Sequence, residues 1–410
     1  MTGLVERPGA VNAHTHLYSG LVPLGMPAPF PRPATFLEIL RHVWWRLDRS
    51  LDAEALRAAA RYYVAHALLA GTTTIVDHHE SPNFIGSSLD VIASACDELG
   101  ARAVLCYGAT ERNFGREEAC AGLAECQRFI ESRREGRVRG AIGLHASFTV
   151  SDATLLEAGD MARALGVPVH VHVAEDRADV DDARARGHDS PLSRLLAYGA
   201  LPIGSILAHG VHLTESEVCN SEALVLWLVH NPRSNANNRV GYAGALTASS
   251  RVALGTDGFP ADMEEELMIA RDEATAHGDV LAAVEARLGT GRALAAEIFG
   301  EEAIRSDRVW IDEHHERRSG SVPPARGSVP PAHESGGFRS LRESGSHVPE
   351  RRSGTTEVAV RPHPRVVHVE VDGEPVVRDG ALVRASLAEI ESDARRAAER
   401  LWKRMEEIPS

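Results

Sequence analysis

Short apolar runs alternate with amphipathic stretches along residues 9–257 of the chain. Each run of β-branched or apolar residues ends in a polar or glycine-containing loop, and a stretch with apolar residues at helical spacing follows it. This order predicts serial βα units and a parallel sheet. We expect eight strands, at residues 8–14, 72–79, 101–108, 139–146, 167–173, 204–210, 223–230 and 251–257.

Eight such units suit a closed (β/α)8 barrel, although the pattern alone also allows an open doubly wound sheet. Residues capable of chemistry gather at the C-terminal ends of the expected strands, which is the face where such a barrel carries its active site. These residues are His14, Asp77, His145, His172, His209, His230 and Asp257. Their common position favours the barrel over the open sheet.

The pattern changes after Phe299. Residues 314–356 hold few large apolar side chains and two copies of GSVPPA, so we expect a disordered insertion. Two alternating runs then flank Asp372-Gly373, which predicts a hairpin, and residues 386–408 have the spacing of a final helix. We therefore expect a barrel at 1–313, an insertion at 314–356, and a hairpin with a helix at 357–410.

Composition and charge narrow the partners and the kind of metal site. The formal net charge of -14 opposes close approach to a phosphate backbone, so we expect no nucleic-acid partner. No apolar run reaches the roughly 18 residues that span a bilayer, and the first residues lack the order of a signal peptide. We expect no membrane association and a cytoplasmic location. The five cysteines form no CxxC pair, so any metal site must rest on histidine and carboxylate.

Two His-x-His triplets end expected strands. His14 and His16 lie on one face of their strand because side chains alternate with period two, so both imidazoles can bind one ion. His170 and His172 form the second triplet, and Glu175 follows three residues later. One triplet arises readily by chance in a chain with 20 histidines, and two satisfied histidines on a buried strand explain the second equally well.

The combined set is a stronger signal than any of its members. His209 ends one expected strand and Asp257 ends another, and either alone is more often structural, since Asp before Gly is a common turn residue. Residues from four strands that meet at one barrel mouth would supply nitrogen and oxygen ligands and an open position for water.

Longer motifs carry a resemblance to a known family. PGAVNAHTH, VHVHVAED, LAHGVHL and LGTDG resemble the amidohydrolase superfamily, in the branch of cytosine and guanine deaminases and triazine chlorohydrolases. HTHLYSGL, WWRLDR, GTTTIVDHHESP, HASFTV, HNPRSNANNRVGY and LGTDGFPADMEEE are similar to an aminohydrolase of that branch. The similarity covers roughly residues 8–300.

The resemblance implies one divalent metal ion, usually zinc and sometimes iron, held without a carboxylated lysine. The implied ligands are His14, His16, His172 and Asp257. A metal ion can lower the pKa of bound water from 15.7 to about 7, which yields a metal-bound hydroxide at cellular pH.

The resemblance also implies proton chemistry for Glu175 and His209, and a substrate pocket faced by His79 and His145. Asp257 and His209 would orient and deprotonate the water. The hydroxide would attack a carbon flanked by nitrogens while Glu175 protonates the ring nitrogen, and ammonia would leave.

Three further candidates come from the residues themselves. Trp45, with Trp44, can stack on a planar ligand, although a helix buried by two indoles is the commoner explanation. His78 is expected to pack behind its strand. The segment after the 223–230 strand can bind substrate or brace its own loop through Arg233, Asn235 and Asn237.

The chain departs from the family at its periphery. Members usually build part of a small β-sandwich before the first His-x-His strand, whereas this chain begins almost at that strand. After the barrel, only the hairpin at 366–380 resembles the sandwich. We expect a truncated sandwich remnant whose exposed apolar surface is covered by a second subunit or by the inserted segment, and we expect a homodimer.

We expect a hydrolytic deaminase that acts on a small heterocycle, namely a purine, a pyrimidine or a related cyclic amidine. A hydrolase that expels chloride or opens a ring at the same metal centre is an alternative, because each reaction passes through a tetrahedral adduct. A second alternative is a metal-binding pseudoenzyme without turnover, since the periphery of the fold is reduced.

Overall fold

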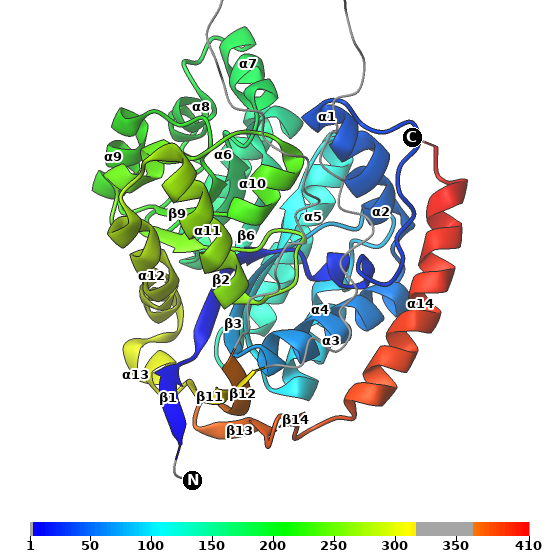
Figure 1. Ribbon diagram of the computed structural model, residues 1–410. Helices are drawn as coiled ribbons and strands as arrows, with labels where there is room; N and C mark the ends of the chain where they lie inside the picture. The colour runs from blue at the N-terminus through cyan, green and yellow to red at the C-terminus, as the bar shows by residue number, and fades with distance from the viewer. Residues whose placement is uncertain (1–2, 317–363, 410) are drawn as a thin grey trace, which may run out of the picture.

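The computed structural model describes residues 3–316 and 364–409. Eight parallel strands form a barrel in the order β10-β9-β8-β7-β6-β4-β3-β2, and β5 (Val138–Gly140) pairs with β4 (Figure 1). The strands are Ala10–Thr15 (β2), Thr72–His79 (β3), Arg102–Ala109 (β4), Ile142–Ala146 (β6), Val169–Val173 (β7), Ile206–His209 (β8), Trp227–His230 (β9) and Val252–Leu254 (β10). Each lies within or overlaps an expected strand, and the barrel prediction is confirmed.

A single isolated bridge between β2 and the loop after β10 nearly closes the sheet. Thr15 pairs with Asp257 in parallel register. The Thr256 amide donates to the His14 carbonyl at 2.9 Å, and the His16 amide donates to the Asp257 carbonyl at 3.3 Å. The bridge therefore fixes Asp257 beside the His14–His16 segment.

Helices surround the barrel and bury its outer face (Figure 1). Their ends carry the expected signals: Asp52 caps α3 by accepting from the Ala55 amide, and Gly166 ends α6 at φ 69°. The helices are Phe36–Ile39 (α1), Trp45–Ser50 (α2), Ala53–Leu69 (α3), Ser88–Leu99 (α4), Arg116–Ser132 (α5), Asp152–Leu165 (α6), Arg177–Ala185 (α7), Pro191–Ala197 (α8), Glu215–Ala223 (α9), Pro232–Asn238 (α10), Met263–His277 (α11), Leu281–Phe299 (α12) and Glu301–Arg305 (α13).

A small antiparallel sheet lies at one end of the barrel, in the order β1-β11-β12-β13-β14 (Figure 1). Its strands are Leu4–Pro8 (β1), Arg308–Glu316 (β11), Pro364–Val371 (β12), Glu374–Arg378 (β13) and Ala381–Leu382 (β14). The expected hairpin is confirmed: Asp372 and Gly373 form its turn with φ of 58° and 71°.

The sheet is larger than the hairpin alone that the sequence predicts. β1 and β11 come from residues that we expected to belong to the barrel part, and β11 continues through Glu316. β1 escaped notice because it is short and largely exposed, so its burial does not alternate. The rest of the expected insertion, from residue 317, lies outside the described residues.

The predicted final helix is confirmed as α14, Leu387–Glu407. Ser386 caps it by accepting from the Glu389 amide, and its buried face includes Ile390, Leu401 and Met405. The helix runs along the flank of the barrel beside α2 and α3 (Figure 1). None of the helices in residues 3–316 and 364–409 combines the length and hydropathy that a bilayer crossing needs.

Candidate active site

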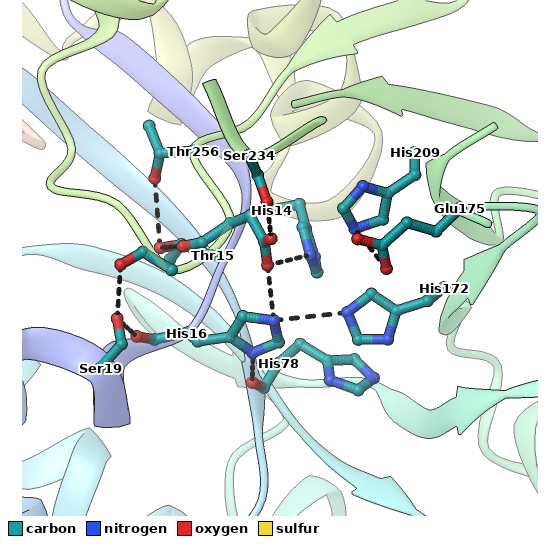
Figure 2. Close-up of polar contacts among 12 residues, drawn as sticks. His14, Thr15, His16, Ser19, His78, His172, Glu175, His209, Ser234 and Thr256 are labelled. Atoms are coloured by element: carbon teal, nitrogen blue, oxygen red, sulfur yellow. Dashed lines mark hydrogen bonds and ion pairs between the residues drawn. The ribbon is translucent and has the colours of Figure 1, made fainter. Parts of the chain in front are cut away.

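Three imidazoles and one carboxylate converge at the C-terminal mouth of the barrel (Figure 2). Asp257 Oδ1 lies 2.8 Å from His16 Nε2 and 3.5 Å from His14 Nε2. His172 Nε2 lies 3.4 Å from His16 Nε2. Ligand atoms about 2.1 Å from a tetrahedral ion lie roughly 3.4 Å from one another, so these separations match those of metal ligands.

The hydrogen bonds of the outer ring nitrogens orient the inner ones. His16 Nδ1 faces the His78 carbonyl at 2.5 Å, and His172 Nδ1 faces the His145 carbonyl at 2.6 Å. A carbonyl only accepts, so each Nδ1 carries a proton, and in the neutral ring each Nε2 presents a lone pair.

His14 is held in the same way by another imidazole. Its Nδ1 lies 2.9 Å from His170 Nε2, whereas its own Nε2 is buried without a hydrogen-bond partner among the described residues. Lone pairs that face one another in a buried site need a positive charge between them. The donor set therefore suits a divalent cation.

Burial and pairing set the charge of this group. Burial lowers the pKa of His14 to about 3 and holds the pKa of His172 well below its usual range. Burial alone would raise the pKa of Asp257, but the nearby imidazoles of His14 and His16 outweigh it and hold this pKa well below its ordinary value. Burial alone would lower the pKa of His16, but its hydrogen bond with Asp257 raises this pKa to about 9. A bound cation would displace the proton of His16, because neutral imidazoles and an ionised carboxylate are the forms that ligate metals.

An unusual backbone conformation sets the direction of the Asp257 and His209 side chains. Asp257 and His209 have φ of 52° and 76°, a region that non-glycine residues rarely adopt. His209 is the last residue of β8, and Asp257 lies in the loop that follows β10. Just before Asp257, a Cβ on Gly255 would lie 2.8 Å from the His14 carbonyl oxygen, so only glycine permits this close approach.

Glu175 and His209 lie next to each other, beside the three imidazoles and Asp257. Glu175 Oε2 lies 3.6 Å from His209 Nε2 (Figure 2). His209 Nδ1 lies 2.9 Å from Asn235 Oδ1, which leaves Nε2 as the free nitrogen. Burial raises the pKa of Glu175 to about 7. His209 also lies within 4.8 Å of the His14, His172 and Asp257 ligand atoms.

The short helix α10 braces these groups from the side. Ser234 Oγ donates to Asp257 Oδ2, and Asn238 Nδ2 donates to Glu175 Oε1 at 3.3 Å. Asn235, which we expected either to bind substrate or to brace the loop, holds His209. The segment positions the site rather than lining it, apart from Asn238, which does both.

A pocket opens above the convergent residues. Its lining combines apolar and aromatic side chains with a larger number of histidine, acidic and amide side chains. The lining residues are His16, Tyr18, Phe36, Leu40, Trp44, Trp45, Glu80, His145, Ala146, Phe148, His172, Glu175, Asp176, Asp179, Asn238 and Asp257. A planar ligand would therefore meet aromatic side chains and ionisable groups together.

Of the expected substrate contacts, the structure brings two to this pocket. His145 and Trp45 both line it, with ring centroids 6.4 Å apart. His79 does not: its buried ring contacts Ser81 Oγ at 2.8 Å instead. Arg233 does not either, because its guanidinium binds Glu265 and Glu266.

His78 corrects an expectation. It does not pack behind its strand; its ring lies inside the barrel, 4.5 Å from the His172 ring centroid. Because side chains alternate along β3, a strand that turns His78 and Glu80 inward must turn His79 outward. The sequence could have shown that His78 and Glu80 lie on the face opposite to His79. It could not have shown which of these two faces points into the pocket.

Several site residues were missed in the sequence. Glu80 follows the expected strand that ends at His79, and only its distance of two residues from His78 could have indicated it. Ser234 and Asn238 lie four residues apart, on one face of a helix, within the polar segment that sequence analysis had singled out.

Curated relatives share sequence with this chain. A 5'-deoxyadenosine deaminase from Methanopyrus kandleri is 29% identical over 423 residues, which cover 97% of this chain and 86% of that protein. A 5-methylthioadenosine/S-adenosylhomocysteine deaminase from Caldanaerobacter subterraneus is 28% identical over 256 residues, or 61% of this chain. That match spans 56% of the relative's length, and a second such deaminase, from Thermoanaerobacter pseudethanolicus, is matched over 58%.

Solved structures share the fold. A zinc-bound adenosine deaminase from Xanthomonas campestris superposes with a TM-score of 0.74 at 23% identity, covering 97% of this chain and 86% of that one. A zinc complex of an atrazine chlorohydrolase from Arthrobacter aurescens gives 0.72 at 21% identity, covering 97% and 88%. The sequence model of the amidohydrolase family matches residues 7–295. The chain belongs to the amidohydrolase family.

Proposed function

We propose that this protein is a metal-dependent hydrolytic deaminase that acts on an amino-substituted nitrogen heterocycle. The observation that carries the proposal is the convergence of three imidazole Nε2 atoms and one carboxylate oxygen beside the Glu175–His209 pair. Such a combination supplies both a cation site and a proton relay at one pocket.

The cation site would consist of His14, His16, His172 and Asp257. A divalent ion bound there would supply a water acidic enough to act as a nucleophile at neutral pH. We propose a single zinc ion, with iron as the alternative, and the zinc-bound adenosine deaminase of the same fold supports this choice.

The proton steps fall to the acid–base pair. His209 Nε2 is free to take a proton because Asn235 holds its Nδ1. Glu175, with its pKa near 7, can keep a proton and deliver it to a ring nitrogen, which neutralises the charge that develops during attack. Asn238 and Ser234 keep Glu175 and Asp257 in place for these transfers.

The relatives suggest where to look for a substrate. Those named above are deaminases of adenine nucleosides, so adenine-type purines form the first class to test. Pyrimidines and other cyclic amidines remain within the proposal, because the same chemistry serves any carbon flanked by nitrogens and bearing an amino group.

The experiment is an ammonia assay of the zinc-loaded protein across purines, pyrimidines, pterins and triazines. We expect ammonia release from at least one of them, and a loss of about 10²–10⁴ in kcat in Glu175→Gln. Asp257→Asn should also abolish turnover. Full activity in either folded variant contradicts the assignment, and bound metal without turnover on any substrate indicates a pseudoenzyme.

A chlorohydrolase or a ring-opening hydrolase is the second candidate. The atrazine chlorohydrolase of the same fold supports it, since a pocket with aromatic side chains also accepts a triazine. Product masses and released chloride, measured in the same assay, separate the leaving groups.

We also propose a homodimer in the cytoplasm. Phe30, Phe114 and Ile203 are exposed apolar side chains that an interface could cover. All five cysteines are unpaired, as is usual in a reducing compartment. Light scattering that gives a monomer mass would contradict the dimer, and recovery of the native protein from an oxidising compartment would contradict the location.

A further inference from the structure

Glu80 is a buried carboxylate in the wall of the pocket. It follows β3 and is 3% exposed. Its Oε1 lies 3.3 Å from His78 Nδ1 and makes no hydrogen bond among the described residues. One of its oxygens also lies within 4.8 Å of ring nitrogens of His145 and His172. Glu80 therefore sits between the proposed metal ligands and the proposed substrate contacts.

The Arg112 guanidinium only partly balances the negative charge of Glu80. Its Oε2 lies 3.8 Å from Arg112 Nη2, which is beyond hydrogen-bond distance. That guanidinium is bound more closely by Asp48, at 2.7 Å, and it lies 4.9 Å from the Trp45 ring. Arg112 therefore lies near the carboxylates of both Asp48 and Glu80 and packs against the Trp45 ring. One oxygen of Glu80 can still accept a hydrogen bond.

The pocket as a whole is acidic. Of its described lining residues, none is a lysine or an arginine. Its carboxylates are Glu80, Glu175, Asp176, Asp179 and Asp257. A bound divalent ion would offset part of this charge near Asp257, and burial raises the pKa of Asp179 to about 7, but Glu80 and Asp176 also line the pocket.

We propose that Glu80 is a specificity-determining residue that accepts a hydrogen bond from an N–H or O–H group of the substrate. The pocket then selects uncharged or cationic heterocycles that are rich in hydrogen-bond donors, and it rejects phosphorylated ones. A donor on the substrate would satisfy a buried oxygen that otherwise lacks a partner. A phosphate would meet buried carboxylates, and the described lining residues include no lysine or arginine to pair with it. The inference rests on the proposed function only in using this pocket as the substrate site.

The test measures binding and turnover separately. Tryptophan fluorescence of the zinc-loaded protein reports ligand binding because Trp44 and Trp45 line the pocket. The probes are matched pairs with and without a phosphate: adenosine and its 5'-monophosphate, guanosine and its 5'-monophosphate, and cytidine and its 5'-monophosphate. We expect at least one nucleoside to bind about tenfold or more tightly than its phosphate at equal ionic strength.

Two substitutions of Glu80 separate its charge from its shape. Glu80→Gln keeps the size but removes the charge, so it should reduce the discrimination within a pair and raise KM more than it lowers kcat. Glu80→Asp should keep the discrimination against phosphate while weakening nucleoside binding. Glu125→Gln is the control, since Glu125 is equally buried but pairs with Arg128 on α5, outside the pocket.

The outcomes distinguish this inference from the proposed function. Equal or tighter binding of the phosphates, unchanged discrimination in Glu80→Gln, or no binding of any probe would overturn the inference. Absence of ammonia with the expected binding preference would overturn the proposed function and leave the inference standing. A purely structural role for Glu80 would lower stability and kcat without changing the preference within a pair.

Discussion

At the scale of single residues, the site depends on which group contacts the Nδ1 atom of each imidazole. The Nδ1 atoms of His16 and His172 face backbone carbonyls, which the barrel itself supplies. His14 differs because its Nδ1 partner is the side chain of His170. Of the three Nδ1 partners, only the His170 side chain can therefore be removed by a substitution.

We predict that His170→Leu weakens zinc affinity by about 10–100-fold, because the orientation of His14 is lost. Competition with a fluorescent zinc chelator measures the change. His66→Gln, on the outer helix α3, is the matched control and should bind zinc as the unmodified protein does. An unchanged affinity in His170→Leu would show that His14 needs no support from behind.

The protonation of a single residue, Glu175, should also make kcat/KM depend on pH. Glu175 has its pKa raised from the ordinary 4.5 to about 7 by burial, so it holds its proton below about pH 7. If it is the proton donor, kcat/KM is full below that pH and falls as the pH rises through it.

A substitution of Asn238 should change the pH at which kcat/KM falls. The Asn238 hydrogen bond favours the ionised form of Glu175, so Asn238→Ala should raise the pKa and shift the falling limb of the kcat/KM profile to higher pH. The exposed Asn220→Ala is the control. A limb that stays in place or moves to lower pH in Asn238→Ala would argue against Glu175 as the titrating group.

At the scale of elements, the pocket wall is fastened by the end of the chain. Trp45 begins α2, and Arg46 next to it donates to the carbonyls of Met405 and Ile408 at 2.6 Å and 3.0 Å. These carbonyls lie at the C-terminus of α14, where the Met405 carbonyl also accepts from the Ile408 amide at 3.3 Å. The final helix therefore supports the segment that carries the aromatic wall.

We predict that Arg46→Ala costs about 1–3 kcal/mol of stability, because two carbonyls lose a charged donor. It should also raise KM more than it lowers kcat, since the wall loosens while the acid–base pair is untouched. Hydrogen exchange should quicken in residues 401–408. The exposed Arg41→Ala is the control, and identical exchange in the two variants would contradict the support role.

At the scale of the whole molecule, a buried ion pair joins the barrel to the small sheet. Arg102, on β4, lies 3.0 Å from both Asp307 and Asp372. Asp307 precedes β11, and its carboxylate also accepts from the Asp372 amide at 2.8 Å. Three segments that are distant in sequence are thus linked at one point away from the site.

We predict that Asp307→Ala lowers the free energy of unfolding by about 3–5 kcal/mol, because it leaves the Arg102 guanidinium buried without its main partner. Urea unfolding measures this change. Glu313→Ala removes an exposed ion pair with Arg7 on the same sheet and should cost far less. Equal costs for the two substitutions would mean that the buried pair has no special role.

Much of the barrel could be predicted from sequence because its signals are local. Apolar runs such as 72–79 and 204–210 are buried on both faces, so the run itself marks the strand. The hairpin at Asp372-Gly373 is equally local, because its turn demands positive φ at both residues. β1 could not be found, since its pairing with β11 joins residues some 300 positions apart.

The site was less predictable than the fold. The residues that end the strands at 14, 172, 209 and 257 could be named because a barrel brings all such ends together. His79 and Arg233 show the limit: the pocket face of β3 depends on one register choice, and the guanidinium of Arg233 depends on carboxylates of α11. For Glu80 and Ser234, the sequence gives only a strand parity and a helix face, and their contacts with His78 and Asp257 depend on the folded barrel.

The most direct test of this account is the zinc content of the purified protein, measured by mass spectrometry after dialysis against a weak chelator. We predict about one ion per chain in the unmodified protein and almost none in a folded variant that carries both His16→Ala and Asp257→Ala. A folded variant that keeps its full ion, or an unmodified protein that binds none, would contradict the claim that these side chains surround one cation.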